Sequence, residues 1–230
     1  MNASPDKCLL LIKTLYGLAQ SSRQYFKTFK STLIDKMGFE DCPCDPCLFK
    51  KQDENGICYV VCYVDDNLCI GDEKAIRAVV KEIPKHGLAV TVTENMDDYL
   101  SCQVIMNEKK NKAWVGQPHM VKKIINKFQD LVKKLPVYKT PGTPNTGLIL
   151  AKEGEDQIDE ARHALYRTGT GMLLYCIKHS RPDIANAVRE LSKCLSRPNE
   201  AAFKEMLRVI KYVHDTPDTG LRMEPIVSDE

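Results

Sequence analysis

Residues 57–70 read Ile-Cys-Tyr-Val-Val-Cys-Tyr-Val-Asp-Asp-Asn-Leu-Cys-Ile, with two short apolar runs on either side of an aspartate pair. Short runs rich in β-branched and aromatic residues predict a β-hairpin with Asp65 and Asp66 at its tip. Two crowded carboxylates repel one another, so this pair indicates a metal ion or a basic partner. A turn without a ligand is the alternative, because aspartate is also a favoured turn residue.

The residues on both sides of this hairpin predict an α+β fold. A helix with an apolar stripe is expected over residues 21–37, started by a serine cap and ended by Gly38 in a left-handed conformation. A second helix is expected over residues 72–83, before a proline. An Asn-Gly turn at 55–56 precedes the strand that carries the aspartates. Further strands are expected at residues 9–15, 47–49, 88–93, 99–106 and 113–115. This order predicts an antiparallel sheet with two helices on one face.

The second half of the chain has a helical period. Apolar residues between 117 and 135 recur at spacings of three and four, which predicts an amphipathic helix. Residues 141–157 hold two prolines and three glycines and are expected to form a loop. Three more helices are predicted, the first over residues 159–179 and the others opened by Pro182 and Pro198.

Composition indicates an ordinary globular protein. The chain has 230 residues, of which 43% are hydrophobic and 28% charged, and no apolar run approaches the length of a membrane span. Residues 1–7 lack the apolar core of a secretory signal, so we expect an intracellular protein with its ten cysteines reduced. Cys42, Cys44 and Cys47, with Cys58 and Cys62, match no common zinc spacing, and apolar packing is the favoured interpretation of these thiols.

Positive charge is concentrated in one segment, although the net charge is only +2. Residues 109–139 contain nine lysines and a single acid, Asp130. A local surplus of this kind would suit a phosphate backbone, but a solvated helix face is an equally good interpretation.

Five landmarks occur in a fixed order along the chain. They are Leu15-Tyr16-Gly17-Leu18-Ala19-Gln20, then Gly38-Phe39 with Asp45-Pro46-Cys47-Leu48-Phe49, then Tyr63-Val64-Asp65-Asp66, then Tyr166-Arg167-Thr168-Gly169 with Leu173-Leu174-Tyr175, and then Arg181-Pro182-Asp183-Ile184. Together they resemble the reverse transcriptase (RNA-directed DNA polymerase) region of copia-type retrotransposons, over residues 8–221. The resemblance implies a polymerase-palm sheet within residues 1–116, a thumb-like basic helix and loop at 117–145, and a helical connection region at 146–230.

The resemblance also implies roles for individual residues. Asp65 would bind Mg²⁺ directly, and Asp66 would complete or tune a two-metal site for nucleotidyl transfer. Gln20 would contact the incoming deoxynucleotide and Gly17 would allow close backbone approach, while Arg23 could face phosphate. A polar cluster that caps the helix is the alternative for Gln20 and Arg23. Contacts to the primer–template would come from Tyr63, Lys122, Lys123 and Lys127.

The chain departs from the family pattern in three places. The family's first palm aspartate lies upstream of the leucine-tyrosine-glycine-leucine motif, and Asp6, the only acid before Asp35, has no matching context. The fingers would also lie upstream, and a glycine of the family is replaced within Tyr99-Leu100-Ser101-Cys102. No acidic cluster after Leu221 suggests the ribonuclease H domain that follows in these polyproteins. We therefore expect a C-terminal palm, thumb and connection that is inactive by itself.

Two other functions remain open. One is a non-catalytic, nucleic-acid-binding remnant that uses the lysines of residues 109–139. The other is a different metal-dependent enzyme, with Asp97 or Asp98 joining Asp65 and Asp66. In the intact element, the resemblance implies a primer–template and deoxynucleotides as substrates, and an upstream fingers and palm segment and a downstream ribonuclease H as partners. It implies location in the cytoplasm, within virus-like particles, or in the nucleus.

Overall fold

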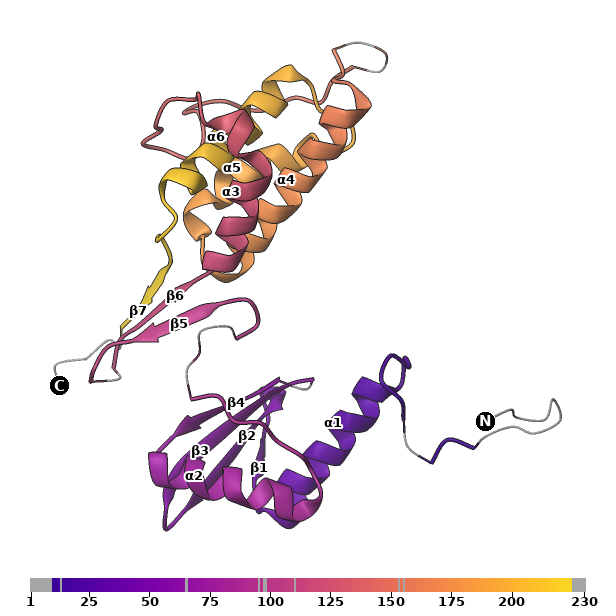
Figure 1. The fold of residues 1–230 in the computed structure, drawn as a ribbon, viewed down its shortest axis with the longest axis vertical. Coiled ribbons are helices and arrows are strands. Elements are labelled where there is room, and N and C mark those ends of the chain that lie inside the picture. Colours follow the sequence, from indigo (N-terminus) through magenta and orange to yellow (C-terminus); the bar gives the residue numbers. More distant parts are fainter. Residues whose placement is uncertain are drawn as a thin grey trace. The chain divides into compact units, whose positions relative to one another are not determined.

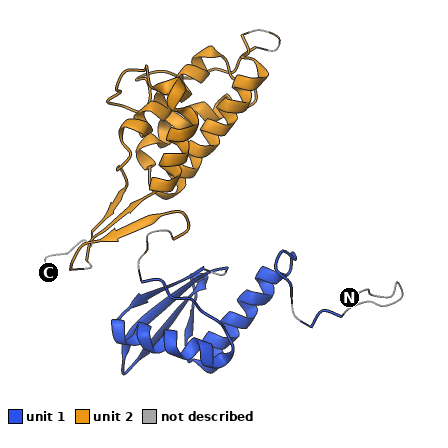
Figure 2. Cartoon of the chain, viewed as in Figure 1, with its two compact units in different colours: residues 1–94 blue, residues 95–230 orange. Residues whose placement is uncertain are grey.

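The computed structural model describes residues 10–12, 14–64, 66–94, 96, 99–109, 111–152, 154 and 156–224. The chain divides into two compact units, residues 1–94 and 95–230 (Figure 2). Each unit has its own cluster of buried apolar side chains. No helix among the described residues is long and apolar enough to cross a membrane.

The first unit contains a four-stranded antiparallel sheet. Its strands follow the chain order and are β1 (Glu40–Cys42), β2 (Asp45–Asp53), β3 (Gly56–Tyr63) and β4 (Asp66–Gly71). Burial along β3 alternates, with Cys58, Val60 and Cys62 buried on one face, as expected for a strand covered on one side. The turn between β2 and β3 is formed by Glu54 and Asn55, and Gly56, at φ +114°, begins β3, so a hairpin is confirmed at the predicted place with its turn one residue earlier than the predicted Asn-Gly pair.

Two helices cover that buried face. Helix α1 (Ser21–Ser31) continues as a π-helical turn (Thr32–Lys36), and α2 (Glu73–Glu82) ends in a 3₁₀ turn (Ile83–His86) (Figure 1). Phe29 from α1, Leu33 from the π-helical turn and Val79 from α2 share one apolar cluster with two residues of the sheet, Phe49 and Val60. Gly38, at φ +71°, ends the first helix as the sequence predicts. The predicted α+β class, with two helices on one face of an antiparallel sheet, is confirmed.

The predicted strand at residues 88–93 is wrong. These residues have no regular secondary structure, and residues 89–94 are exposed. Valine and threonine favour strands, but this preference depends on packing against a neighbouring strand, which the segment lacks. The predicted strand at 99–106 is shortened to β5 (Gln103–Met106), with Tyr99 and Cys102 in an isolated bridge before it.

A second sheet belongs to the second unit. Strand β5 pairs with β6 (Ala113–Gly116), which also pairs with β7 (Leu221–Met223), a strand that the sequence did not predict. The single tryptophan, Trp114, lies in β6 so close to Gly116 and Gly220 that a Cβ at either glycine would collide with its ring.

Four helices form the core of the second unit. They are α3 (Pro118–Val132), α4 (Glu160–His179), α5 (Ala185–Lys193) and α6 (Glu200–Asp215). Asp159 and Asn199 cap α4 and α6 through their side chains. Pro198 therefore precedes the cap of α6 instead of opening the helix, whereas Pro182 opens a 3₁₀ turn (Pro182–Ile184) before α5.

Candidate functional site

The aspartate motif lies at the tip of the β3–β4 hairpin. Tyr63 ends β3 and pairs with Asp66, the first residue of β4, so only two residues of the sequence, 64 and 65, separate the paired strands. Val64 has φ +52°, a conformation that a β-branched residue adopts only where a tight turn imposes it. Tyr63, Val64 and Asp66 are exposed, and Asp65 lies outside the described residues. The hairpin therefore presents an aromatic ring and the Asp66 carboxylate to solvent.

Asp66 is available for a ligand. Its carboxylate makes no ion pair with any residue in the described part of the chain. Carboxylate oxygens are the ligands that Mg²⁺ prefers. Within the described residues, no three acidic, histidine or cysteine side chains gather closely enough to hold a metal, and Asp65, Asp97 and Asp98 lie outside this set.

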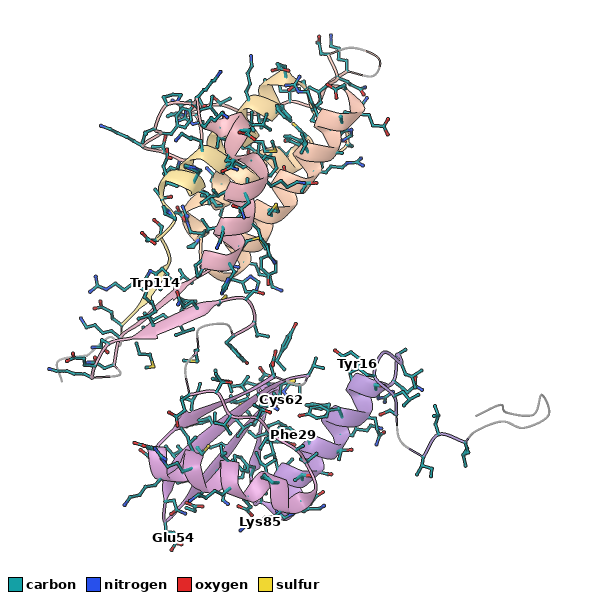
Figure 3. The ribbon with its side chains drawn as sticks, viewed as in Figure 1. Tyr16, Phe29, Glu54, Cys62, Lys85 and Trp114 are labelled. Carbon is teal, nitrogen blue, oxygen red and sulfur yellow. The ribbon has the colours of Figure 1, made fainter. Side chains whose placement is uncertain are left out.

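A hydrogen bond joins this hairpin to α1. The residue after Asp66, Asn67, donates from Nδ2 to Oη of Tyr25 at 3.3 Å. Asn67 shares its face of the sheet with Cys62, its partner on β3, and burial raises the pKa of that thiol to about 11, with a smaller contribution from Cys47. Figure 3 labels Cys62 and Phe29 in this unit, with Glu54 at the opposite end of the sheet. Asn67 and Tyr25 were not predicted as site residues.

The segment before α1 and the first turn of that helix expose the predicted nucleotide-binding residues. Gly17 has φ +93° with open space where a side chain would begin, and Gln20 and Arg23 are exposed. Gln20 occupies the cap position of α1 but makes no capping hydrogen bond with its side chain. Ser21, expected to cap the helix, instead donates from Oγ to the carbonyl oxygen of Leu15 at 2.6 Å. The Gln20 side chain therefore does not cap this helix.

The predicted lysines lie in the second unit, on the exposed side of α3. Val121, Ile124 and Phe128 bury the opposite side of this helix in the core. Lys122, Lys123 and Lys127 are exposed and form no ion pair among the described residues. Lys133, near the end of the same helix, is paired with Asp130 at 2.7 Å.

Residues 1–141 match a family described as "Reverse transcriptase (RNA-dependent DNA polymerase)". The match covers more than half of the chain, so the chain belongs to this reverse transcriptase family. No solved structure matches it.

The chain is similar to the polyproteins of several transposons. It is 27% identical over 212 residues to the retrovirus-related Pol polyprotein from transposon TNT 1-94 of Nicotiana tabacum, over 90% of this chain and 16% of that protein. It is 27% identical over 217 residues to the RE1 Pol polyprotein of Arabidopsis thaliana, over 94% of this chain and 14% of that protein. It is 24% identical over 227 residues to the truncated Ty1-A Gag-Pol polyprotein of Saccharomyces cerevisiae, over 94% of this chain and 18% of that protein. The copia-type resemblance is confirmed, and the chain spans less than a fifth of these relatives.

Proposed function

We propose that the chain contributes the catalytic hairpin of RNA-directed DNA synthesis in a retrotransposon Pol polyprotein. The observation that supports this most is the exposed Asp66 at the tip of a tight antiparallel hairpin, within the region matched by the reverse transcriptase family. The four-stranded sheet and its two helices correspond in this proposal to the polymerase palm. Helix α3 corresponds to the thumb, and residues 146–230 to the connection.

In this proposal Asp65 and Asp66 hold Mg²⁺. Asp66 suits the ion because its carboxylate is exposed and unpaired among the described residues. When bound, two such ions neutralise charge on the attacking 3′-oxygen and the leaving pyrophosphate. Two neighbouring carboxylates on one turn supply too few oxygens for two ions, so a further acid must complete the site.

The surrounding residues bind the substrates. Gln20 and Arg23 contact the deoxynucleotide, Gly17 lets it approach the backbone, and Tyr63 lies against the primer or template. Support comes from their exposure and from the backbone of Gly17, which leaves open space beside it. The nucleotide contacts and the aspartate hairpin all belong to the first unit.

A primer-extension assay tests the catalytic proposal. The 230-residue chain alone should give no incorporation with Mg²⁺ or Mn²⁺, because the described residues bring no third metal-binding side chain to Asp66. Fusion to the preceding fingers and palm segment of the tobacco TNT 1-94 relative should give metal-dependent extension. Asp66→Asn in this fusion should reduce extension by at least about 100-fold, since a neutral amide binds the ion poorly.

The matched control for Asp66→Asn is Glu54→Gln. Glu54 is also an exposed acid next to β3, but it lies at the other end of the sheet (Figure 3), so its loss should leave extension unchanged. Incorporation by the unfused chain would contradict the incomplete site, and equal activity of the two variants would contradict the role of Asp66.

A second candidate function is nucleic-acid binding without catalysis. It is favoured by the exposed face of α3, where Lys122, Lys123 and Lys127 have no acidic partner among the described residues. Lysines that are not neutralised by acids can bind phosphates and release counterions, which makes affinity fall with salt.

A salt series tests this second function. Changing Lys122, Lys123 and Lys127 to alanine should reduce the slope of log affinity against log salt by roughly 2, at about 0.7 per phosphate contact to a single strand. Lys133→Ala is the control, because Lys133 is already paired with Asp130 and should change the slope little. If the affinity of the unmodified chain for nucleic acid did not change with salt, these lysines would be solvated surface residues and the second function would be contradicted.

A further inference from the structure

The helix-covered face of the first sheet carries a pair of cysteines that the proposed polymerase chemistry does not use. Cys58 lies on β3 opposite Gly71, and Cys69 lies on β4 opposite Val60. Cys58 and Val60 belong to the same buried face, so the pairing places both thiols on that face as diagonal neighbours. Cys58 is 1% exposed, and Cys69 is partly accessible.

Beside these thiols, the backbone of β3 leaves no room for a side chain at Gly71 of β4. Gly71 has φ +146°, and a Cβ at this position would collide with the carbonyl oxygen of Ile57 and lie 3.0 Å from Cα of Cys58. The next residue, Asp72, strengthens the same contact by accepting a hydrogen bond from N of Ile57 at 2.8 Å. The contact of β4 with β3 at Cys58 is therefore fixed by the backbone of Gly71 and by the hydrogen bond of Asp72.

The two thiols interact with each other. A hydrogen bond from Cys58 lowers the pKa of the Cys69 thiol, although burial opposes this shift. The same hydrogen bond, followed by burial, raises the pKa of Cys58. The Cys58 S–H has one other acceptor nearby, the carbonyl oxygen of Tyr59, with the sulfur 3.8 Å away. Cys69 is also the more accessible of the two thiols, whereas Cys58 is buried, so a soluble oxidant meets Cys69 first and Cys69 is the nucleophilic member of the pair.

We propose that Cys58 and Cys69 form an oxidisable dithiol that a peroxide converts to a reversible disulfide. The Cys69 thiolate attacks one peroxide oxygen, the O–O bond breaks, and Cys69 becomes a sulfenic acid while hydroxide leaves and is protonated to water. The Cys58 sulfur then attacks the Cys69 sulfur, the S–O bond breaks, and a second water leaves with the Cys58 proton. Two thiols and one hydrogen peroxide give one disulfide and two waters.

The diagonal position makes this disulfide easy to reduce. Diagonal neighbours on antiparallel strands have Cα atoms about 7–8 Å apart, above the usual range of roughly 4.4–6.8 Å for a disulfide. Strands β3 and β4 must shift slightly to close the bond, and strained disulfides are reduced readily. The disulfide would link β3 and β4, the two strands that flank the aspartate motif. Its formation does not require the chain to be an active polymerase.

Peptide mapping of the full chain tests the proposal. The chain is treated with a slight excess of hydrogen peroxide, alkylated, digested with chymotrypsin without reductant, and analysed by mass spectrometry. Cleavage after Tyr59, Tyr63 and Leu68 separates Cys58, Cys62 and Cys69 into different peptides. We expect one cross-linked species that contains Cys58 and Cys69 and that disappears with reduced glutathione. A free Cys69 after treatment, or a link between other cysteines, would overturn the proposal.

Three variants separate the roles of the two thiols. Cys58→Ser keeps a donor but removes the second sulfur, so Cys69 should accumulate as a sulfenic acid that dimedone traps. Cys58→Ala also removes the donor, so alkylation of Cys69 near neutral pH should slow several-fold. Cys62→Ser is the control, because Cys62 is buried on the same face of β3 and should leave the Cys58–Cys69 link intact. Loss of the link in Cys62→Ser, with the fold verified by circular dichroism, would count against the assignment.

Discussion

The hydrogen bond between Asn67 and Tyr25 is the residue-level contact that holds the aspartate hairpin to α1. Asn67 donates to the Tyr25 hydroxyl, while its Oδ1 is buried without a partner among the described residues. A buried amide with one unsatisfied atom depends strongly on its remaining hydrogen bond. The stability of the start of β4, where Asp66 lies, therefore depends on the hydrogen bond to the Tyr25 hydroxyl.

Tyr25→Phe should destabilise the first unit by about 1 kcal/mol, because it leaves the second polar atom of the Asn67 amide unpaired as well. Urea unfolding measures the loss of stability, and hydrogen exchange at amides of β2 and β3 assigns it to the first unit. Tyr16→Phe is the matched control, since Tyr16 is 99% exposed and loses only a solvated hydroxyl. Equal stabilities for the two variants would show that the Asn67 contact contributes nothing.

Single residues differed in how well the sequence predicted them. The position of Tyr63 and Asp66 at a hairpin tip was predicted from a contiguous motif between two strand-like runs, and the structure places both there, exposed, while their roles in the site stay predictions. The contact between Asn67 and Tyr25 could not be found, because it joins residues 42 positions apart through the packing of α1 on the sheet. Neither residue type nor local spacing indicates such a pair.

At the scale of elements, α6 contains a nearly buried ion pair. Lys211 Nζ lies 2.6 Å from Oδ1 of Asp215, and their side chains are only 8% and 14% exposed. Burial acts to raise the pKa of Asp215, but hydrogen bonds from Lys211 and His214 outweigh it, so the pKa is lowered overall. Because the folded pKa lies below the ordinary value of 3.8, this carboxylate stabilises the fold above that pH and less as the pH falls further.

Lys211→Met should cost roughly 3 kcal/mol at pH 7, because Asp215 would remain charged and nearly buried with His214 as its remaining partner. The difference from the unmodified chain should shrink as the pH falls into the acid range and Asp215 becomes protonated. Urea unfolding at several pH values measures both effects. Lys204→Met is the control on the same helix, since Lys204 is 74% exposed and lies 3.8 Å from Glu200, and it should cost under about 0.5 kcal/mol. A pH-independent loss in Lys211→Met would indicate altered packing instead.

Helices and hairpins were predicted where periodicity extends over many residues. The apolar stripe of α1, the face of α3 and the hairpin between β2 and β3 each involve local patterns, and each is present in the structure. Strands β1 and β7 have three residues each, too few to show alternation, and they exist because neighbouring strands pair with them. Residues 88–93 are the converse case. Their composition favours a strand, but no neighbouring strand pairs with them, and they have no regular secondary structure.

At the scale of the whole molecule, the two units have separate cores. Phe49 is buried in the first and Phe128 in the second, each fully enclosed by side chains of its own cluster. Residues 89–94, at the boundary between the units, are exposed and lack regular structure. An exposed connection between separate cores favours units that unfold independently.

A reciprocal pair of core variants tests this independence. Phe128→Ala should destabilise the second unit by about 3–5 kcal/mol through the cavity that it leaves, and Phe49→Ala should do the same to the first. Trp114, the single tryptophan, reports on the second unit, so only Phe128→Ala should lower its fluorescence midpoint in urea. Hydrogen exchange at amides of β3 should respond only to Phe49→Ala. If both variants shifted the tryptophan midpoint equally, the two cores would unfold as one cooperative structure, and residues 89–94 would transmit stability between them.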